Sequence, residues 1–139
     1  LICEIQQSSN STYRLYDYDR KDKDGNLREL HIEKALQVIN TNKYEPFISK
    51  YSEEKNDGYS KKTVCSCKYF QVFVYDVKDD VEFYVDRASF NALVFLDGFG
   101  TVSNGEVEMA LKKGDTFFLP AGIGNVKVNG ECKFIVANV

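Results

Sequence analysis

The chain has 139 residues, enough for one ordinary domain or for one domain and part of another. Hydrophobic residues make up 43% and charged residues 28%, a composition that folds and excludes a disordered tail. The net charge of −3 gives no attraction to nucleic acid, and no apolar run reaches the roughly 20 residues of a membrane span. A single histidine excludes a metal site built from several imidazoles of this chain.

The chain starts at Leu1, without an initiator Met and without a basic segment ahead of an apolar one. We therefore expect a fragment of a longer protein rather than an intact secreted one. Four scattered cysteines are too few for a disulfide framework, which favours a reduced, cytoplasmic location. Cys65 and Cys67 lack the spacing and the second pair of a zinc ribbon, so we expect them to be core or surface residues.

The first part of the chain predicts two strands and a turn. Residues 1–7 are rich in apolar side chains and predict a short strand. Residues 12–19 alternate between two faces with period 2, which predicts a second strand. Residues 21–26 are charged and contain Asp24-Gly25, a signal for a tight turn.

A change of period then predicts one helix. Within residues 30–40, the side chains of Ile32, Ala35, Leu36 and Ile39 recur at the spacing of one helical face. This pattern predicts an amphipathic helix.

The remaining sequence predicts a connector followed by many short strands. Residues 44–62 are polar with no sustained period, so we expect a linker or long loop. From residue 63 onward, β-branched and aromatic runs alternate with turn residues, which favours a sandwich or jelly roll. The expected strands are residues 69–77, 81–86, 90–96, 107–111, 116–119, 125–128 and 133–139. The Asn-Gly pairs at 104–105 and 129–130 are the strongest hairpin signals.

A Pro-x-Gly turn lies between two of these expected strands. The segment resembles the second sequence motif of the cupin superfamily, which has Gly, five residues, Pro-x-Gly, two residues, His, three residues and Asn. Gly114, Pro120, Gly122 and Asn129 match this motif in register, whereas Asn125 occupies the histidine position. The resemblance implies a barrel in which Gly114 begins a strand and the Pro-x-Gly turn sends the chain back across the barrel mouth.

The first cupin motif has lost its metal ligands. When it is set on Gly98, its glutamate position falls on Asn91, and its two histidine positions fall within residues 84–87, which contain no histidine. Imidazole and carboxylate ligands are what would hold a divalent ion. We therefore expect this barrel to bind no metal, which also argues against an iron-dependent cupin dioxygenase.

The N-terminal third carries a more specific resemblance. Residues 4–9 (E-I-Q-Q-S-S), 12–20 (T-Y-R-L-Y-D-Y-D-R) and 25–31 (G-N-L-R-E-L-H) resemble mannose-6-phosphate isomerases of the short bacterial type. The likeness continues through the predicted helix and into residues 114–122. It implies that this chain is the C-terminal portion of such an enzyme. In that family a Gln, two His and a Glu hold one zinc ion, and the resemblance places all four upstream of Leu1.

The resemblance also implies a domain organisation for this mostly-β chain. Residues 1–29 would be closing strands of a truncated catalytic cupin, and residues 30–62 would be the helix and polar connector. Residues 63–139 would form a second, metal-free, cupin-type jelly-roll barrel. The chain alone would bind no zinc and would be inactive, and exposed edges of its first strands could pair between copies.

Two positions match active-site residues of the family. Glu4 matches a carboxylate that moves protons, and Arg14 matches an arginine close to the substrate. The reaction interconverts mannose 6-phosphate and fructose 6-phosphate through an enediol, which needs a base and stabilisation of charge. Without the resemblance, Glu4 is a solvated strand residue and Arg14 forms a surface ion pair with a neighbouring aspartate. His31, at the start of the helix, is expected to serve surface or packing roles.

A second function class stays open. A degenerate cupin can act as a binding or scaffolding module with no chemistry of its own. Glu4 and Arg14 would then be structural, and the barrel from residue 63 onward would carry the ligand.

Overall fold

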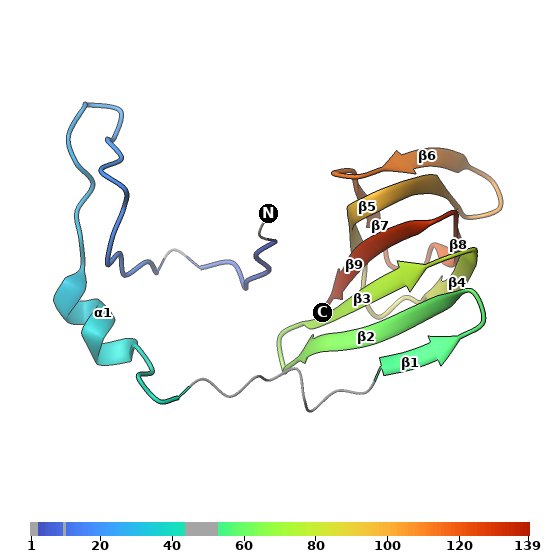
Figure 1. Ribbon diagram of the computed structural model, residues 1–139, viewed down its shortest axis with the longest axis horizontal. Coiled ribbons are helices and arrows are strands. Elements are labelled where there is room, and N and C mark those ends of the chain that lie inside the picture. The colour runs from blue at the N-terminus through green and yellow to red at the C-terminus, as the bar shows by residue number, and fades with distance from the viewer. Residues whose placement is uncertain (1–2, 10, 44–52) are drawn as a thin grey trace. The chain divides into compact units, whose positions relative to one another are not determined.

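The computed structural model describes residues 3–9, 11–43 and 53–139 (Figure 1). They belong to two compact units. The first, here called the hairpin–helix unit, is Gln6–Glu45. The second, the sheet unit, is Pro46–Val139 together with Leu1–Ile5. The first two residues of the expected first strand, and residues 44–52 of the expected connector, lie outside the described residues.

Antiparallel strands make up the sheet unit, which confirms the prediction of a mostly-β, cupin-like fold. Their bounds are β1 (Glu53–Asn56), β2 (Tyr59–Ser66), β3 (Gln71–Val77), β4 (Asp80–Val85), β5 (Asn91–Ser103), β6 (Glu108–Lys112), β7 (Thr116–Leu119), β8 (Gly124–Asn129) and β9 (Cys132–Asn138).

The strands form two layers that share β5. The N-terminal half of β5 pairs with β7 on one side and with β9 on the other, and the first layer continues from β9 through β3 and β2 to β1. The C-terminal half of β5 pairs with β6 and β8, and β4 follows β8 in the second layer. Figure 1 shows the resulting curled sheet. The long strand β5 therefore belongs to both layers and connects them.

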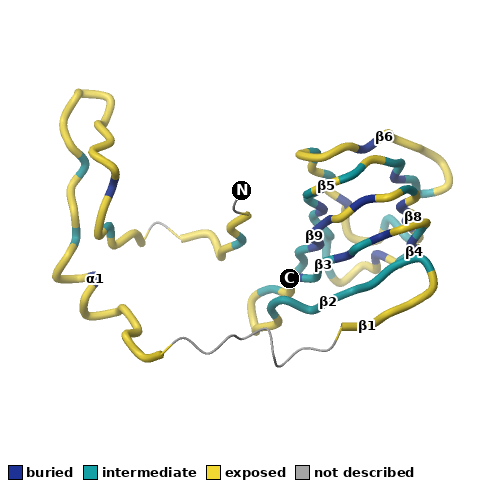
Figure 2. The backbone as a smooth tube through the Cα atoms, in the orientation of Figure 1, coloured by how far each residue is buried: buried dark blue, intermediate teal, exposed yellow. Residues whose placement is uncertain are grey.

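Alternating side chains of both layers fill the space between them. Phe134 on β9 is fully buried and stacks on Tyr75 of β3, with ring centroids 5.0 Å apart. Phe95 on β5 packs against the ring of Phe134, with ring centroids 4.9 Å apart. Val126 and Val128 of β8 face this core from the second layer. Burial alternates along β8, whereas Phe134, Ile135 and Val136 of β9 are buried consecutively (Figure 2).

Two glycines allow β5 to change layers. Its pairing with β9 shifts register between Phe95 and Asp97, which marks a β-bulge. Gly98 has a φ of +83°, and a Cβ there would lie 2.1 Å from the carbonyl oxygen of Glu131. A Cβ on Gly100 would lie 1.9 Å from the carbonyl oxygen of Asn129. Both positions need glycine because the chain segment joining β8 to β9 crosses directly over β5.

Three predictions in this part of the chain were wrong in detail. The strand expected at residues 90–96 continues to Ser103, because Asp97 and Gly98 stay paired with Lys133 and Cys132 of β9 instead of forming a turn. Asn129-Gly130 passes the chain from one layer to the other instead of closing a hairpin. Residues 53–56 and the start of β2 are strands within the expected connector.

The hairpin–helix unit has little regular structure. Helix α1 (Ile32–Val38) lies within the helix expected at residues 30–40, which confirms that prediction. The expected strands are absent from residues 3–9 and 11–19, and the described part of residues 3–29 has one isolated bridge, from Lys21 to Leu27. Within this unit, Ala35 and Asp17 are the buried residues among those described (Figure 2).

Candidate active-site residues

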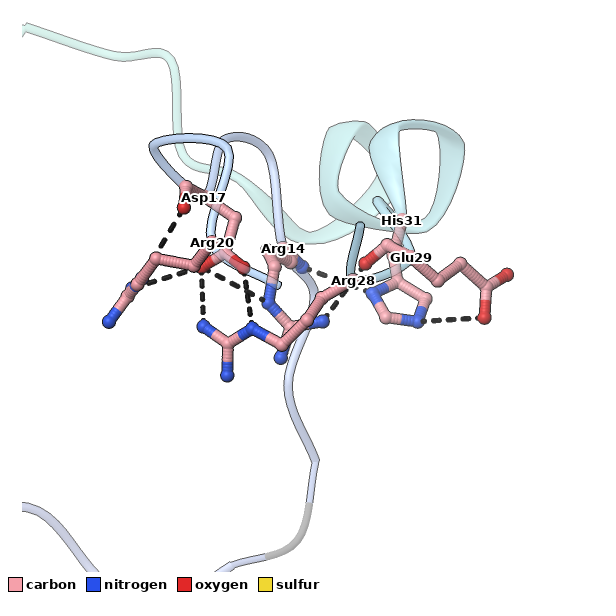
Figure 3. A network of polar contacts seen from close by, with 6 residues as sticks. All are labelled: Arg14, Asp17, Arg20, Arg28, Glu29 and His31. Atoms are coloured by element: carbon pink, nitrogen blue, oxygen red, sulfur yellow. Dashed lines mark hydrogen bonds and ion pairs between the residues drawn. The ribbon is translucent and has the colours of Figure 1, made fainter. Parts of the chain in front are cut away.

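Three arginines surround one buried aspartate in the hairpin–helix unit (Figure 3). Arg28 makes a bidentate contact with Asp17, its Nε and Nη2 donating to the two carboxylate oxygens at 2.5 Å each. The Nη2 of Arg20 donates to Oδ1 at 2.9 Å, and the Nε of Arg14 lies 3.7 Å from the same oxygen. We call these four residues the arginine cluster. It holds three guanidinium charges against one carboxylate.

A tight turn of the backbone creates the first half of the cluster. Tyr18 and Asp19 both have a φ of 53°, the left-handed conformation that the central residues of a type I′ turn require. The backbone N–H of Arg20 donates to the carbonyl oxygen of Asp17 at 3.0 Å and closes the turn. This turn explains why the alternating pattern of residues 12–19 does not form a strand.

A second turn brings Arg28 back to Asp17. The side chain of Asp22 accepts hydrogen bonds from the backbone N–H groups of Asp24 and Asn26, at 2.9 and 3.0 Å. Gly25, with a φ of +84°, completes this turn, as Asp24-Gly25 predicted. The sequence contains this turn signal, but nothing in the spacing of Asp17 and Arg28 indicates that they pair.

The cluster fixes the charge of its aspartate. The hydrogen bonds from Arg28 hold the pKa of Asp17 below its usual value, and the positive charges of Arg20 and Arg14 act in the same direction. Asp17 raises the pKa of Arg28 in return. The carboxylate is therefore ionised at neutral pH and keeps the three guanidinium groups together.

Backbone contacts hold Arg14, the arginine singled out by the sequence, against the start of α1. Its Nη1 donates to the carbonyl oxygen of Glu29 at 2.9 Å, and its backbone carbonyl accepts from the N–H of His31 at 2.7 Å. The imidazole Nδ1 of His31 accepts from the backbone N–H of Arg14 at 3.3 Å. His31 therefore has a packing role here, and the half-buried side chain of Arg14 has a fixed orientation.

Glu4, the second residue singled out, is exposed. It belongs to the sheet unit, whereas Arg14 belongs to the hairpin–helix unit. The expected pairing of the two residues in one active site stays a prediction.

The residues of the cupin motif form the turn that the sequence implied. Gly114, with a φ of +91°, precedes β7, and Gly122 follows that strand in the Pro-x-Gly turn. Asn125, at the position of the motif's histidine, is exposed on β8, with Val126 and Val128 facing the core. Asn91, at the glutamate position, accepts a hydrogen bond from the Asn138 side chain at 3.1 Å.

An apolar cavity of about 220 Å³ lies between the second layer and β7. Its walls include Val102, Met109, Phe117 and Ile123. Neither Glu4 nor the arginine cluster contributes to it.

The described residues do not fit a zinc site. Residues 3–9, 11–43 and 53–139 contain no group of three or more His, Cys, Asp or Glu side chains placed to hold a metal ion. A catalytic zinc needs three protein ligands. The same residues include no helix with the length and apolar character of a membrane span.

Comparison with known proteins supports a cupin fold and a specific family. Streptomyces Pac13, a nucleoside dehydratase, superposes with a TM-score of 0.59 over 70% of this chain and 82% of its own, at 14% identity. That likeness shows the fold alone. The family model for the cupin domain of mannose-6-phosphate isomerase matches residues 60–139. The chain belongs to this family.

Similar isomerases extend well beyond the length of this chain. The mannose-6-phosphate isomerase ManA of Bacillus subtilis is 35% identical over 139 residues, which are 100% of this chain and 44% of ManA. A crystal structure of the mannose 6-phosphate isomerase from Bacillus subtilis superposes with a TM-score of 0.78, at 34% identity, over 94% of this chain and 41% of its own. The chain thus spans less than half the length of these relatives, as the predicted fragment would.

Proposed function

We propose that this chain acts as the C-terminal part of a mannose-6-phosphate isomerase and contributes Arg14 and Glu4 to its active site. The observation that carries the proposal is the match of the whole chain to less than half of ManA. In this proposal residues 1–29 complete the catalytic cupin and residues 63–139 form the second barrel. Residues 30–62 are the helix and connector that join the two. The enzyme would work in the cytoplasm.

The surface of the hairpin–helix unit supports the proposal. Leu36 and Val38 of α1 are 63% and 66% exposed, and Leu27 is 62% exposed. Of the four residues in the apolar stripe predicted for the helix, Ala35 is the one that is buried. An apolar surface of this kind indicates that further protein covers it. In this proposal the N-terminal part of the isomerase covers this apolar surface.

The arginine cluster suits a phosphorylated sugar. Asp17 and the carbonyl of Glu29 engage Nε and Nη1 of Arg14, and its Nη2 donates to none of the described residues. Nη2 is thus the atom of Arg14 that can bind the substrate's phosphate or the oxygen that becomes negative in the enediol. The rigid contacts to Asp17 and Glu29 orient the guanidinium before the substrate binds.

Glu4 would move the proton between C1 and C2 of the sugar. A carboxylate can remove the proton from C2 of mannose 6-phosphate and return it to C1, which yields fructose 6-phosphate. Zinc, when bound by residues outside this chain, would supply Lewis-acid chemistry at the sugar oxygens. The isolated chain lacks that part and is expected to be inactive.

A chimaera tests the proposal. The segment of ManA that this chain matches is replaced by the chain, and conversion of mannose 6-phosphate is measured. Arg14→Lys, Arg14→Ala and Glu4→Gln are expected to lower kcat by about 100-fold or more. The exposed residues Lys23 and Glu33 provide the matched controls: Lys23→Ala and Glu33→Gln are expected to stay within about threefold of the parent.

The chimaera also separates the two function classes. If the Arg14 and Glu4 variants fold, bind zinc and keep turnover within about threefold, both residues are structural, and the assignment is wrong. If the chimaera folds and binds zinc yet shows no turnover, the chain is a binding or scaffolding module.

A further inference from the structure

Two cysteines lie two residues apart where β2 ends. Cys65 pairs with Val72 of β3, directly after a shift of register that begins at Thr63. Cys67 follows Ser66, the last residue of the strand. Cys65 is half-buried and Cys67 is exposed. One thiol is therefore open to reagents in solution, and the other is shielded beside it.

A turn holds the sulfur of Cys67 against the backbone. The N–H of Cys67 donates to the carbonyl oxygen of Phe70 at 3.0 Å, and the thiol of Cys67 donates to the same oxygen at 3.4 Å. Backbone hydrogen bonds from Tyr69 and Phe70 lower the pKa of the Cys67 thiol. Since the thiolate is the reactive form, Cys67 is suited to attack an electrophile.

Cys65 has the opposite character. Burial raises the pKa of its thiol, and the neighbouring Cys67 adds to the effect. Cys65 in turn helps to lower the pKa of the Cys67 thiol. Cys65 is thus a protonated thiol placed next to an activated one, the arrangement of a resolving and an attacking cysteine.

The chain can bring the two sulfurs into a bond. Residues two apart span at most about 7 Å between Cα atoms, close to the upper limit of roughly 6.8 Å for a disulfide. Formation of the bond therefore needs the backbone to bend at Ser66, the last residue of β2. Two thiolates alone do not make a metal site, and the described residues place no group of three metal-binding side chains anywhere.

We propose that Cys65 and Cys67 form a dithiol modification site, which a low-molecular-weight disulfide such as oxidised glutathione converts to an intrachain disulfide. The Cys67 thiolate attacks one sulfur of the reagent, the reagent's S–S bond breaks, and one glutathione thiolate leaves. Cys65 then loses its proton to solvent and attacks Sγ of Cys67, releasing the second glutathione. The two cysteines lose two electrons and two protons, which the reagent gains. This site is independent of the proposed isomerase activity.

The digestion pattern of the chain makes the test direct. Trypsin cleaves after Lys62 and Lys68, so residues 63–68 leave as one peptide that carries both thiols. The folded chain is equilibrated with mixtures of reduced and oxidised glutathione, quenched with acid, alkylated and digested. We expect this peptide to become lighter by two hydrogen atoms and to resist alkylation. Buried Cys132 is expected to stay unmodified.

Single variants assign the roles. In Cys65→Ser, the glutathione adduct on Cys67 is expected to accumulate, because nothing resolves it. In Cys67→Ser, Cys65 is expected to gain the adduct at least tenfold more slowly, because burial keeps it protonated. Cys3→Ser, which removes an exposed cysteine outside the pair, is expected to leave the internal bond unchanged. The proposal is overturned if residues 63–68 carry two separate adducts without an internal bond, or if Cys65 reacts as fast as Cys67.

Discussion

Substitution of Gly100 by alanine tests how the two layers are joined. The new Cβ would lie 1.9 Å from the carbonyl oxygen of Asn129 and 3.1 Å from Cα of Gly130. Both neighbours are backbone atoms of the segment that joins β8 to β9, so no side-chain rotation can relieve the contact. Overpacking typically costs about 1–3 kcal/mol, and this contact lies at or above the upper end. We expect Gly100→Ala to lower the free energy of unfolding by about 3 kcal/mol or more.

Gly105 provides the matched control. It lies in the loop between β5 and β6 with a φ of +89°, and a Cβ there meets nothing within 4 Å. Alanine at this position therefore carries the cost of the left-handed conformation alone, about 1 kcal/mol. Urea denaturation followed by far-ultraviolet circular dichroism measures both variants, and equal m-values show that the same surface unfolds. If Gly100→Ala is no less stable than Gly105→Ala, the crossing of β5 by the β8–β9 segment is wrong.

Two further predictions concern the core and the arginine cluster. Phe134→Ala should lower the free energy of unfolding by about 3–5 kcal/mol, whereas the same change at Phe118, which is 66% exposed, should lower it far less. Urea denaturation measures both variants. Equal losses of stability would contradict the placement of Phe134 in the core. The lowered pKa of Asp17 means that its stabilising contribution is present above its ordinary value of 3.8 and is lost as the pH falls through its lower folded value. The NMR resonance of the Arg28 Nε–H should therefore keep its hydrogen-bonded shift down to pH 3.8, and loss of that shift near neutral pH would contradict the ion pair.

Local patterns predicted the elements whose neighbours are close in sequence. The helix followed from the spacing of Ile32, Ala35 and Ile39, and α1 lies within the expected range. The Asn-Gly pair at 104–105 predicted the β5–β6 hairpin, and Ser103 pairs with Glu108 across it. The loop has four residues because the Asn104 side chain accepts hydrogen bonds from two N–H groups within it.

Elements that depend on distant contacts could not be predicted in this way. β1 has four exposed polar residues at the edge of its layer, so it has no apolar alternation to detect. Gly98 indicates a turn by its identity, yet it pairs with Cys132 of β9 inside the long strand β5, where its missing Cβ leaves room for the carbonyl of Glu131. Contacts of that kind are set by the packing of the sheet and leave no local signal.

The candidate site was predicted in part. Arg14 came from resemblance to a family, and the structure adds the contacts that orient its guanidinium. Arg28 and Arg20 carried no recognised role in the sequence, because the pairing of each with Asp17 depends on two turns of the backbone. A motif search for i, i+3 charge pairs would have found Arg14, Asp17 and Arg20. It would have missed Arg28.

The central claim is that this chain supplies the C-terminal part of a working isomerase. The most direct measurement is the rate at which the ManA chimaera converts mannose 6-phosphate to fructose 6-phosphate, beside the rate of the isolated chain with added zinc. The account predicts turnover by the chimaera within about tenfold of ManA and none by the isolated chain. Turnover by the isolated chain, or a folded and zinc-loaded chimaera without activity, would contradict it.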